Sequence, residues 1–135
     1  MPTVSVTSTN AGATVFCAET RGHNLFCDIP SAMGGTDTAM TPVEALLGAL
    51  GNCLGTVIAL VCQNKGLVYE GLSVDVAANY DPDAHRIDDF VVTVHMPGPI
   101  DEATRRAVEA AEPLCNVHNT LTHGAQVKTV LVGPE

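Results

Sequence analysis

One long uncharged stretch in the middle of the chain most constrains its fold. Residues 41–66 read TPVEALLGALGNCLGTVIALVCQNKG, and Ala45–Cys62 carries no charged side chain. Such a segment predicts a helix that is apolar on nearly every side, and a helix of this kind is buried. Its length approaches that of a membrane span. Its glycines and polar residues lower its hydrophobicity, however, and strand-like segments follow at once, so we expect a central helix in a soluble protein and no membrane partner.

The ends of this helix are marked by local signals. Thr41 is a favourable N-cap, Pro42 suits the first helical position, and Glu44 completes a capping box with Thr41. Lys65 falls in the last turn and Gly66 suits the position just after it. The sequence therefore predicts a helix of about 24 residues, roughly 36 Å long.

Composition suggests that this helix needs a second subunit to cover it. The chain has 135 residues, of which 46% are hydrophobic and only 16% charged. This length supports one domain with a modest core, and we expect a single domain over residues 1–135. So short a chain can hardly surround an apolar helix on all sides, and we therefore predict a homodimer.

Charge and cysteine content limit the classes of function. The net charge is −9 with only six Lys and Arg residues, which argues against a nucleic-acid partner. The N-terminus lacks the basic and apolar regions of a signal peptide, so we expect a cytoplasmic protein with reduced thiols. Five cysteines, an odd number, then favour reactive, metal-bound or buried thiols over a structural disulfide framework.

The remaining elements predict an α+β fold. Two strands precede the long helix, a hairpin of alternating apolar residues follows it, and a second helix capped by Asp101 leads to a final strand. Antiparallel sheet packed against helices is the expected architecture. The expected ranges are 13–19, 23–29, 41–66, 72–80, 90–96, 101–112 and 126–132.

Two cysteine phrases and this order of elements resemble the OsmC/Ohr family of thiol peroxidases, with OsmC named for osmotic induction and Ohr for organic hydroperoxide resistance. Residues 34–53, from Gly-Gly through TPVEALL to Cys53, resemble the first cysteine helix of that family. Residues 114–121, LCNVHNTL, resemble its second cysteine motif, which follows the second helix. The resemblance extends over essentially the whole chain.

The resemblance implies an intertwined homodimer, with antiparallel sheets wrapped around long central helices. It also implies that Cys53 is the peroxidatic thiol and Cys115 the resolving thiol, with an organic hydroperoxide as substrate and an external dithiol as reductant. The chemistry is coherent, because a thiolate attacked by peroxide becomes a sulfenic acid, and a second thiol converts that to a disulfide.

Arg21 and Glu44 are the other candidate catalytic residues. The family uses an arginine from its N-terminal strands to activate the peroxidatic cysteine, and Arg21 is the only arginine before residue 86. Glu44 is a cap first and an orienting carboxylate for Arg21 second. Val43 stands where the best-known branch has an acidic residue, and Asn116 replaces the usual proline. These departures resemble the less characterised OsmC-like branches.

The other polar candidates have simpler interpretations. Cys62 is expected to fill the core, and Cys17 and Cys27 to lie in strands, where facing each other would allow a disulfide. His118 and His123 lie near Cys115, and Cys115 and His118 have a zinc-compatible spacing, but this set lacks a convincing fourth ligand. Local hydrogen bonding or capping is therefore the simpler role for His118, and neither a metal nor another cofactor is expected. An alternative function is a non-catalytic dimer that binds a small apolar or thiol ligand, or a redox sensor.

Overall fold

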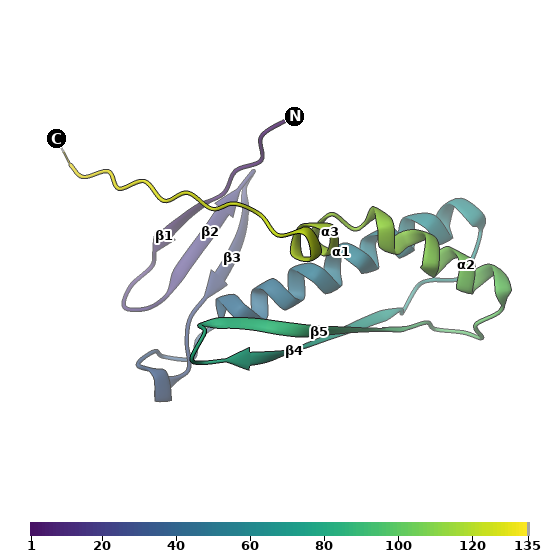
Figure 1. Cartoon of the computed structure of the whole chain (residues 1–135), viewed down its shortest axis with the longest axis horizontal. Coiled ribbons are helices and arrows are strands. Elements are labelled where there is room, and N and C mark those ends of the chain that lie inside the picture. Colours follow the sequence, from purple (N-terminus) through teal and green to yellow (C-terminus); the bar gives the residue numbers. More distant parts are fainter. Residues whose placement is uncertain (135) are drawn as a thin grey trace. The chain divides into compact units, whose positions relative to one another are not determined.

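The computed structural model describes residues 1–134, which fold into two compact units (Figure 1). The first unit comprises Met1–Gly48 and Ala78–Asp89, and the second comprises Ala49–Ala77 and the segment from Phe90 onwards. Three elements contribute residues to both units, and these are α1 (Pro42–Lys65), β4 (Ser73–Asp81) and β5 (Arg86–His95).

A three-stranded antiparallel sheet lies in the first unit (Figure 1). Its strands follow chain order, β1 (Thr7–Asn10), β2 (Phe16–Thr20) and β3 (His23–Cys27). The predicted hairpin of two strands before the long helix is confirmed, although β2 begins three residues later than expected.

The turn between β2 and β3 consists of Arg21 and Gly22. Their φ angles are 50° and 79°, so both residues lie in the left-handed region. A two-residue turn of this kind matches the right-handed twist of the flanking strands. Glycine adopts this conformation freely, whereas it is unfavourable for arginine. The hairpin tip therefore holds Arg21 in a strained backbone conformation.

The register of this hairpin separates its two cysteines. Cys17 lies opposite Phe26, and Cys27 lies opposite Phe16. Directly opposed residues share a face of the sheet, and neighbouring residues alternate between faces, so the two thiols point to opposite sides. The sequence left open that Cys17 and Cys27 face each other, and the register shows that they do not.

The long helix begins and ends as the sequence predicts. The Thr41 N–H donates to Glu44 Oε1 at 2.8 Å, and the Glu44 N–H donates to Thr41 Oγ1 at 3.1 Å, which is a complete capping box. The helix ends at Lys65, and Gly66 follows with a φ of 68°.

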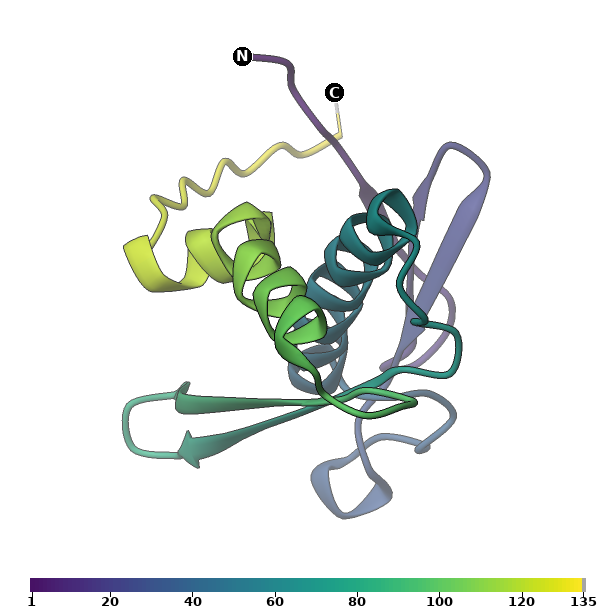
Figure 2. The ribbon, with the colours of Figure 1, turned by 90° about the vertical axis from the view of Figure 1, so that its right-hand side faces the viewer.

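The second unit contains the apolar core. Within it, α1 and α2 (Glu102–Ala111) lie side by side over one face of the β4–β5 ribbon (Figure 2). The side chains of Val76, Phe90, Val92 and Val94 pack against this core, which confirms the alternation predicted for the ribbon. Its fully buried members are Leu50, Leu54, Ile58, Cys62, Ala107, Ala111 and Cys115.

The segment after α2 forms a short helix that the sequence did not predict. As expected, Asp101 caps α2 by accepting from the Thr104 N–H at 2.8 Å, and Pro113 interrupts it. A 3-10 turn, η2 (Glu112–Leu114), then leads to α3 (Asn116–His123). Asparagine, threonine and histidine are weak helix formers, so propensity gave no signal for α3.

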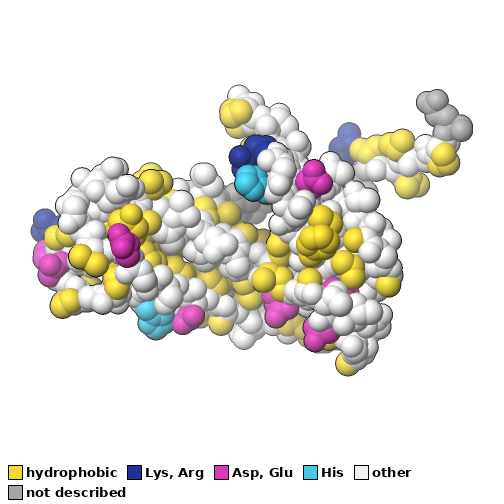
Figure 3. Space-filling view, turned by 180° about the vertical axis from the view of Figure 1, so that it is seen from behind, with side chains coloured by type: hydrophobic (Ala, Val, Ile, Leu, Met, Phe, Trp, Pro, Cys, Tyr) yellow, Lys and Arg dark blue, Asp and Glu magenta, His cyan; other side chains and the backbone are white. Residues whose placement is uncertain are grey.

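The last predicted strand is not formed. Residues 124–134 have no regular secondary structure, and Val127, Val130, Leu131 and Val132 are exposed. Figure 3 shows apolar side chains along this arm, beside the grey atoms at the end of the chain. The segment is rich in β-branched residues that favour a strand, but a strand also needs a neighbouring strand for its hydrogen bonds, and no strand within residues 1–134 pairs with the arm.

The long helix is also less buried than its composition suggested. One stripe of α1 is buried, whereas Val43, Leu46 and Leu60 are exposed. The helix is long and apolar enough to cross a membrane by length and composition alone, a property that it shares with core helices of soluble proteins.

Candidate active site

Two cysteines from distant parts of the chain meet in the second unit. Cys53 lies on α1 beside the buried stripe of Leu50, Leu54 and Ile58, and its side chain is partly buried against the core. Cys115 is fully buried and is the N-cap residue of α3. Both thiols are free, and they interact directly with each other.

The first turn of α3 makes Cys53 the more acidic thiol. Burial by itself raises the pKa of Cys53, because it disfavours the charged form. Hydrogen bonds from the Val117 N–H, the Cys115 thiol and the Asn116 N–H outweigh burial, so the pKa falls below the ordinary value. Free N–H groups at a helix N-terminus stabilise a nearby anion, and here that anion is the Cys53 thiolate.

Cys115 is shifted in the opposite direction. Burial is the largest cause and raises its pKa, and the neighbouring Cys53 raises it further. The N–H groups of His118 and Val117 only partly offset this rise. The pair therefore favours a thiolate at Cys53 that accepts a hydrogen bond from a protonated thiol at Cys115.

One of the departures noted in the sequence adds a donor to this site. Asn116 is the first residue of α3, a position at which proline is well tolerated. Proline has no N–H, so an asparagine there supplies a hydrogen-bond donor that proline would lack. The backbone of Asn116 is among the groups that lower the pKa of Cys53. This departure therefore strengthens the thiolate site.

Arg21 and Glu44 both belong to the first unit, and their roles at the thiols remain predictions. Arg21 is exposed at the β2–β3 turn. Glu44 is engaged in the capping box, and hydrogen bonds from the Thr41 N–H and then the Thr41 side chain lower its pKa.

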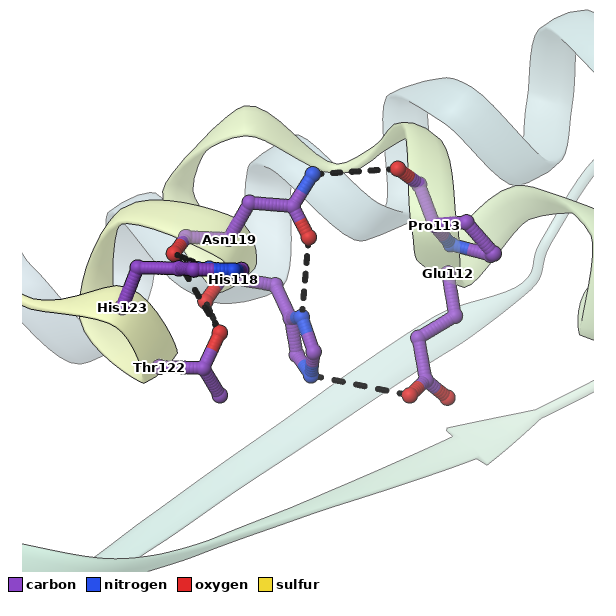
Figure 4. A network of polar contacts seen from close by, with 6 residues as sticks. All are labelled: Glu112, Pro113, His118, Asn119, Thr122 and His123. Atoms are coloured by element: carbon purple, nitrogen blue, oxygen red, sulfur yellow. Dashed lines mark hydrogen bonds and ion pairs between the residues drawn. The ribbon is translucent and has the colours of Figure 1, made fainter.

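A polar network whose partners the sequence did not reveal links residues that precede and follow Cys115 in the chain (Figure 4). His118 Nε2 is 3.6 Å from Glu112 Oε1, and Asn119 Nδ2 donates to the Pro113 carbonyl at 3.0 Å. The sequence indicated the zinc-compatible spacing of Cys115 and His118, with local hydrogen bonding or capping as the simpler role for His118. Within residues 1–134, no group of three His, Cys, Asp or Glu side chains is arranged to hold a metal ion.

A groove of about 680 Å³ runs along a different side of α1 in the second unit. Its wall on α1 includes Gly51, Asn52 and Thr56, and Tyr69 and Glu70 are on the opposite wall. It is open to solvent, and neither Cys53 nor Cys115 lines it. The thiol pair and the groove are therefore separate features of the same helix.

Comparison with known families identifies the class of protein that this fold and thiol pair define. The model of the OsmC-like protein family matches residues 35–130. This chain therefore belongs to the OsmC-like family. No curated protein sequence matches it significantly.

Solved structures show the same fold at low sequence identity. An OsmC-like protein from Mycoplasma pneumoniae is 17% identical with a TM-score of 0.73, covering 90% of this chain and 88% of that one. An organic hydroperoxide resistance protein OsmC from Legionella pneumophila is 19% identical with a TM-score of 0.58, covering 90% and 91%. An organic hydroperoxide resistance protein from Elizabethkingia anophelis is 17% identical with a TM-score of 0.58, and the match covers 88% of this chain and 89% of that chain.

Proposed function

We propose that this protein is a thiol peroxidase that reduces organic hydroperoxides, with Cys53 as the attacking thiol and Cys115 as the resolving thiol. The observation that carries this proposal is the pairing of two free cysteines with opposite pKa shifts in one buried site. Family membership and similarity to two proteins named for organic hydroperoxide resistance support a role in hydroperoxide chemistry.

The reaction follows from the protonation states of the two thiols. The Cys53 thiolate attacks one oxygen of ROOH, the O–O bond breaks, and the alkoxide takes a proton to leave as ROH. Cys53 is then a sulfenic acid. The Cys115 sulfur attacks the sulfur of that acid, hydroxide leaves with the proton of the Cys115 thiol as water, and a disulfide forms. An external dithiol restores both thiols by exchange and is itself oxidised to a disulfide.

Arg21 and Glu44 complete the proposed site. Arg21 supplies a positive charge to the Cys53 thiolate, and Glu44 orients that guanidinium. The strained backbone of Arg21 supports a functional role, because unfavourable conformations are retained most often at functional positions.

The active protein is proposed to be a cytoplasmic homodimer. The apolar residues exposed on α1 and on the C-terminal arm support this, since a second subunit would cover them. The residues concerned are Val43, Leu46 and Leu60 on the helix and Val127, Val130, Leu131 and Val132 on the arm.

The test is thiol counting with intact-mass measurement and peptide mapping before and after one equivalent of cumene hydroperoxide. We expect rapid loss of two thiols and a Cys53–Cys115 disulfide. Cys53→Ser should lower peroxide consumption to the rate of free cysteine, whereas Cys17→Ser, in a strand of the first unit, should leave it unchanged. Slow oxidation spread over all five cysteines would refute the proposal.

The groove favours one alternative, a non-catalytic dimer that binds a small apolar or thiol ligand or acts as a redox sensor. About 680 Å³ is within the range of small-molecule sites, and the groove lies apart from the thiols. This alternative predicts that ligand binding survives Cys53→Ser and that peroxide turnover never exceeds that of free cysteine. Isothermal calorimetry with the Cys53→Ser variant separates the two functions.

A further inference from the structure

Cys115 lies at a junction between two short helical segments. Its N–H donates to the Glu112 carbonyl at 3.1 Å, and its carbonyl accepts from the Asn119 N–H at 3.0 Å. The chain before Cys115 is the turn η2, and the chain after it is the first turn of α3. The two N–H groups that interact with Cys53, those of Asn116 and Val117, belong to this first turn.

The first turn of α3 has little to hold it in place locally. The helix has only eight residues, and its N-cap residue makes no side-chain hydrogen bond to it. Isolated helices of this length are marginal in water. The direction of its free N–H groups must therefore be fixed by contacts with neighbouring segments.

Side chains on both sides of Cys115 supply those contacts (Figure 4). Asn119 Nδ2 donates across the junction to the Pro113 carbonyl at 3.0 Å. His118 Nε2 lies 3.6 Å from Glu112 Oε1, and His118 Nδ1 lies 3.5 Å from Asn119 Oδ1. We call Glu112, His118 and Asn119 the junction clamp. It ties η2 to α3 around Cys115.

We propose that the junction clamp is a positioning device for the nucleophile, holding the first turn of α3 so that its N–H groups point at the Cys53 sulfur. His118 and Asn119 act through the backbone of Asn116 and Val117, and the clamp does not touch the substrate. Preorganised donors cost no rearrangement when charge develops, so such a clamp increases the nucleophilicity of Cys53 at neutral pH. The inference rests on the proposed function only in taking Cys53 as the nucleophile.

The experiment measures the Cys53 thiol itself. The rate of iodoacetamide alkylation of the Cys53 peptide is followed by mass spectrometry as a function of pH, because only the thiolate reacts. The double variant His118→Ala/Asn119→Ala should raise the alkylation midpoint, the pH at which alkylation reaches half of its maximum rate, toward the value of an ordinary thiol. Alkylation at pH 7 should become about fivefold slower, which corresponds to one weakened hydrogen bond. His118→Gln, which keeps a side-chain donor toward Glu112, should change the rate less than His118→Ala.

Two further variants calibrate the result. Asn116→Pro removes a single N–H donor at a position where proline suits the helix, and it should shift the midpoint in the same direction. Thr122→Ala removes bonds to the His118 and Asn119 carbonyls, at 2.7 and 3.2 Å, and should leave the midpoint unchanged. If the double variant does not fold, Glu112→Ala, at an exposed side chain, removes the His118–Glu112 contact alone.

The clamp is refuted if folded clamp variants alkylate at Cys53 like the wild type. A midpoint that shifts equally in Thr122→Ala also overturns it, because the effect would then report the general stability of α3. Neither measurement requires peroxide turnover. A protein that fails to reduce hydroperoxides but shows the clamp effect would refute the proposed function alone.

Discussion

The two units of the chain are stabilised by different interactions. The second buries seven apolar residues, contributed by α1, by α2 and by Cys115 at the start of α3. Among the described residues, the only side chain that the first unit buries is the carboxylate of Asp28, 1% exposed. Phe16, Leu25 and Phe26 of its sheet remain about half exposed.

Asp28 takes the place of an apolar core in the first unit. Its Oδ1 accepts from the Thr14 hydroxyl at 2.6 Å, and its Oδ2 accepts from the hydroxyls of Thr36 and Thr38 at 2.5 and 2.9 Å. The N–H groups of Thr36 and Thr38 donate to the same Oδ2 at 3.2 and 3.1 Å. One carboxylate thus joins the loop before β2 to the loop that leads into α1.

The comparison shows that directional and non-directional stabilisation have different weaknesses. Stabilisation by apolar burial tolerates small shifts of the side chains and increases with the apolar area that is buried. A buried carboxylate requires each of its donors, because an unmade bond leaves the full cost of desolvation. We therefore expect the first unit to open locally at a lower free energy than the second.

The largest expected effect is on the core of the second unit. Ile58 is fully buried, so Ile58→Ala should lower the free energy of unfolding by about 2–5 kcal/mol through lost burial and a residual cavity. Chemical denaturation measures this loss. Val68→Ala, in the same unit and 74% exposed, is the control and should have a much smaller effect, because Val68 lies outside the face of α1 that a second subunit is proposed to cover. Equal losses would mean that burial in this core does not determine the stability of the second unit.

A smaller, local effect is expected at Asp28. Asp28→Asn keeps one acceptor but places an amide where N–H donors converge, so the first unit should open more often while the core of the second stays intact. Amide hydrogen exchange should show faster exchange in β2 and β3 only. Asp37→Asn, at an exposed residue of the same loop, is the control. Exchange that accelerates equally in α2 would show that the units do not open independently.

The carboxylate of Asp28 also makes the stability of the first unit depend on pH. Hydrogen bonds, first from Thr14 and next from Thr36, lower the pKa of Asp28 despite its burial. The unfolded chain takes up this proton near pH 4, and the folded chain does so only at lower pH. Stability from the network is therefore complete above about pH 4 and is lost as the pH falls below it. Asp28→Asn should remove this acid sensitivity from the exchange of the first unit.

Sequence patterns predicted the elements whose signals are local. The capping box of Thr41 and Glu44 fixed the start of α1, and alternation of apolar residues located the β4–β5 ribbon. The Asp28 network could not be predicted, because its partners Thr14 and Thr36 are brought to Asp28 only by the fold. The strand predicted for residues 126–132 is wrong for the opposite reason. Its residues favour a strand locally, but a strand forms only where a neighbouring strand pairs with it.

The candidate site was predicted in outline through resemblance rather than through local patterns. The resemblance paired Cys53 with Cys115, and these two thiols interact directly in the structure, whereas their catalytic roles stay predictions. The α3 N–H donors were missed, because a helix that weak in propensity is recognised only from its contacts. Asn116 illustrates the difference, since it departs from the family motif in sequence yet supplies a donor to Cys53 in the structure.

The smallest expected effect separates stability from function in the first unit. Arg21 adopts a left-handed conformation that asparagine accepts more readily, and Asn-Gly is a favoured pair in two-residue hairpin turns. Arg21→Asn should therefore slow amide exchange in β2 and β3, a stabilisation of about 0.5–1 kcal/mol.

If Arg21 stabilises the Cys53 thiolate, the same variant should reduce peroxide consumption. Arg21→Lys keeps the positive charge but does not relieve the strain of the turn, so it should retain more activity at unchanged stability. A variant that gains stability and keeps full activity would leave Arg21 as a turn residue alone. The polar unit would then have no direct part in the chemistry, which would rest on the α3 donors and Cys115 of the apolar unit.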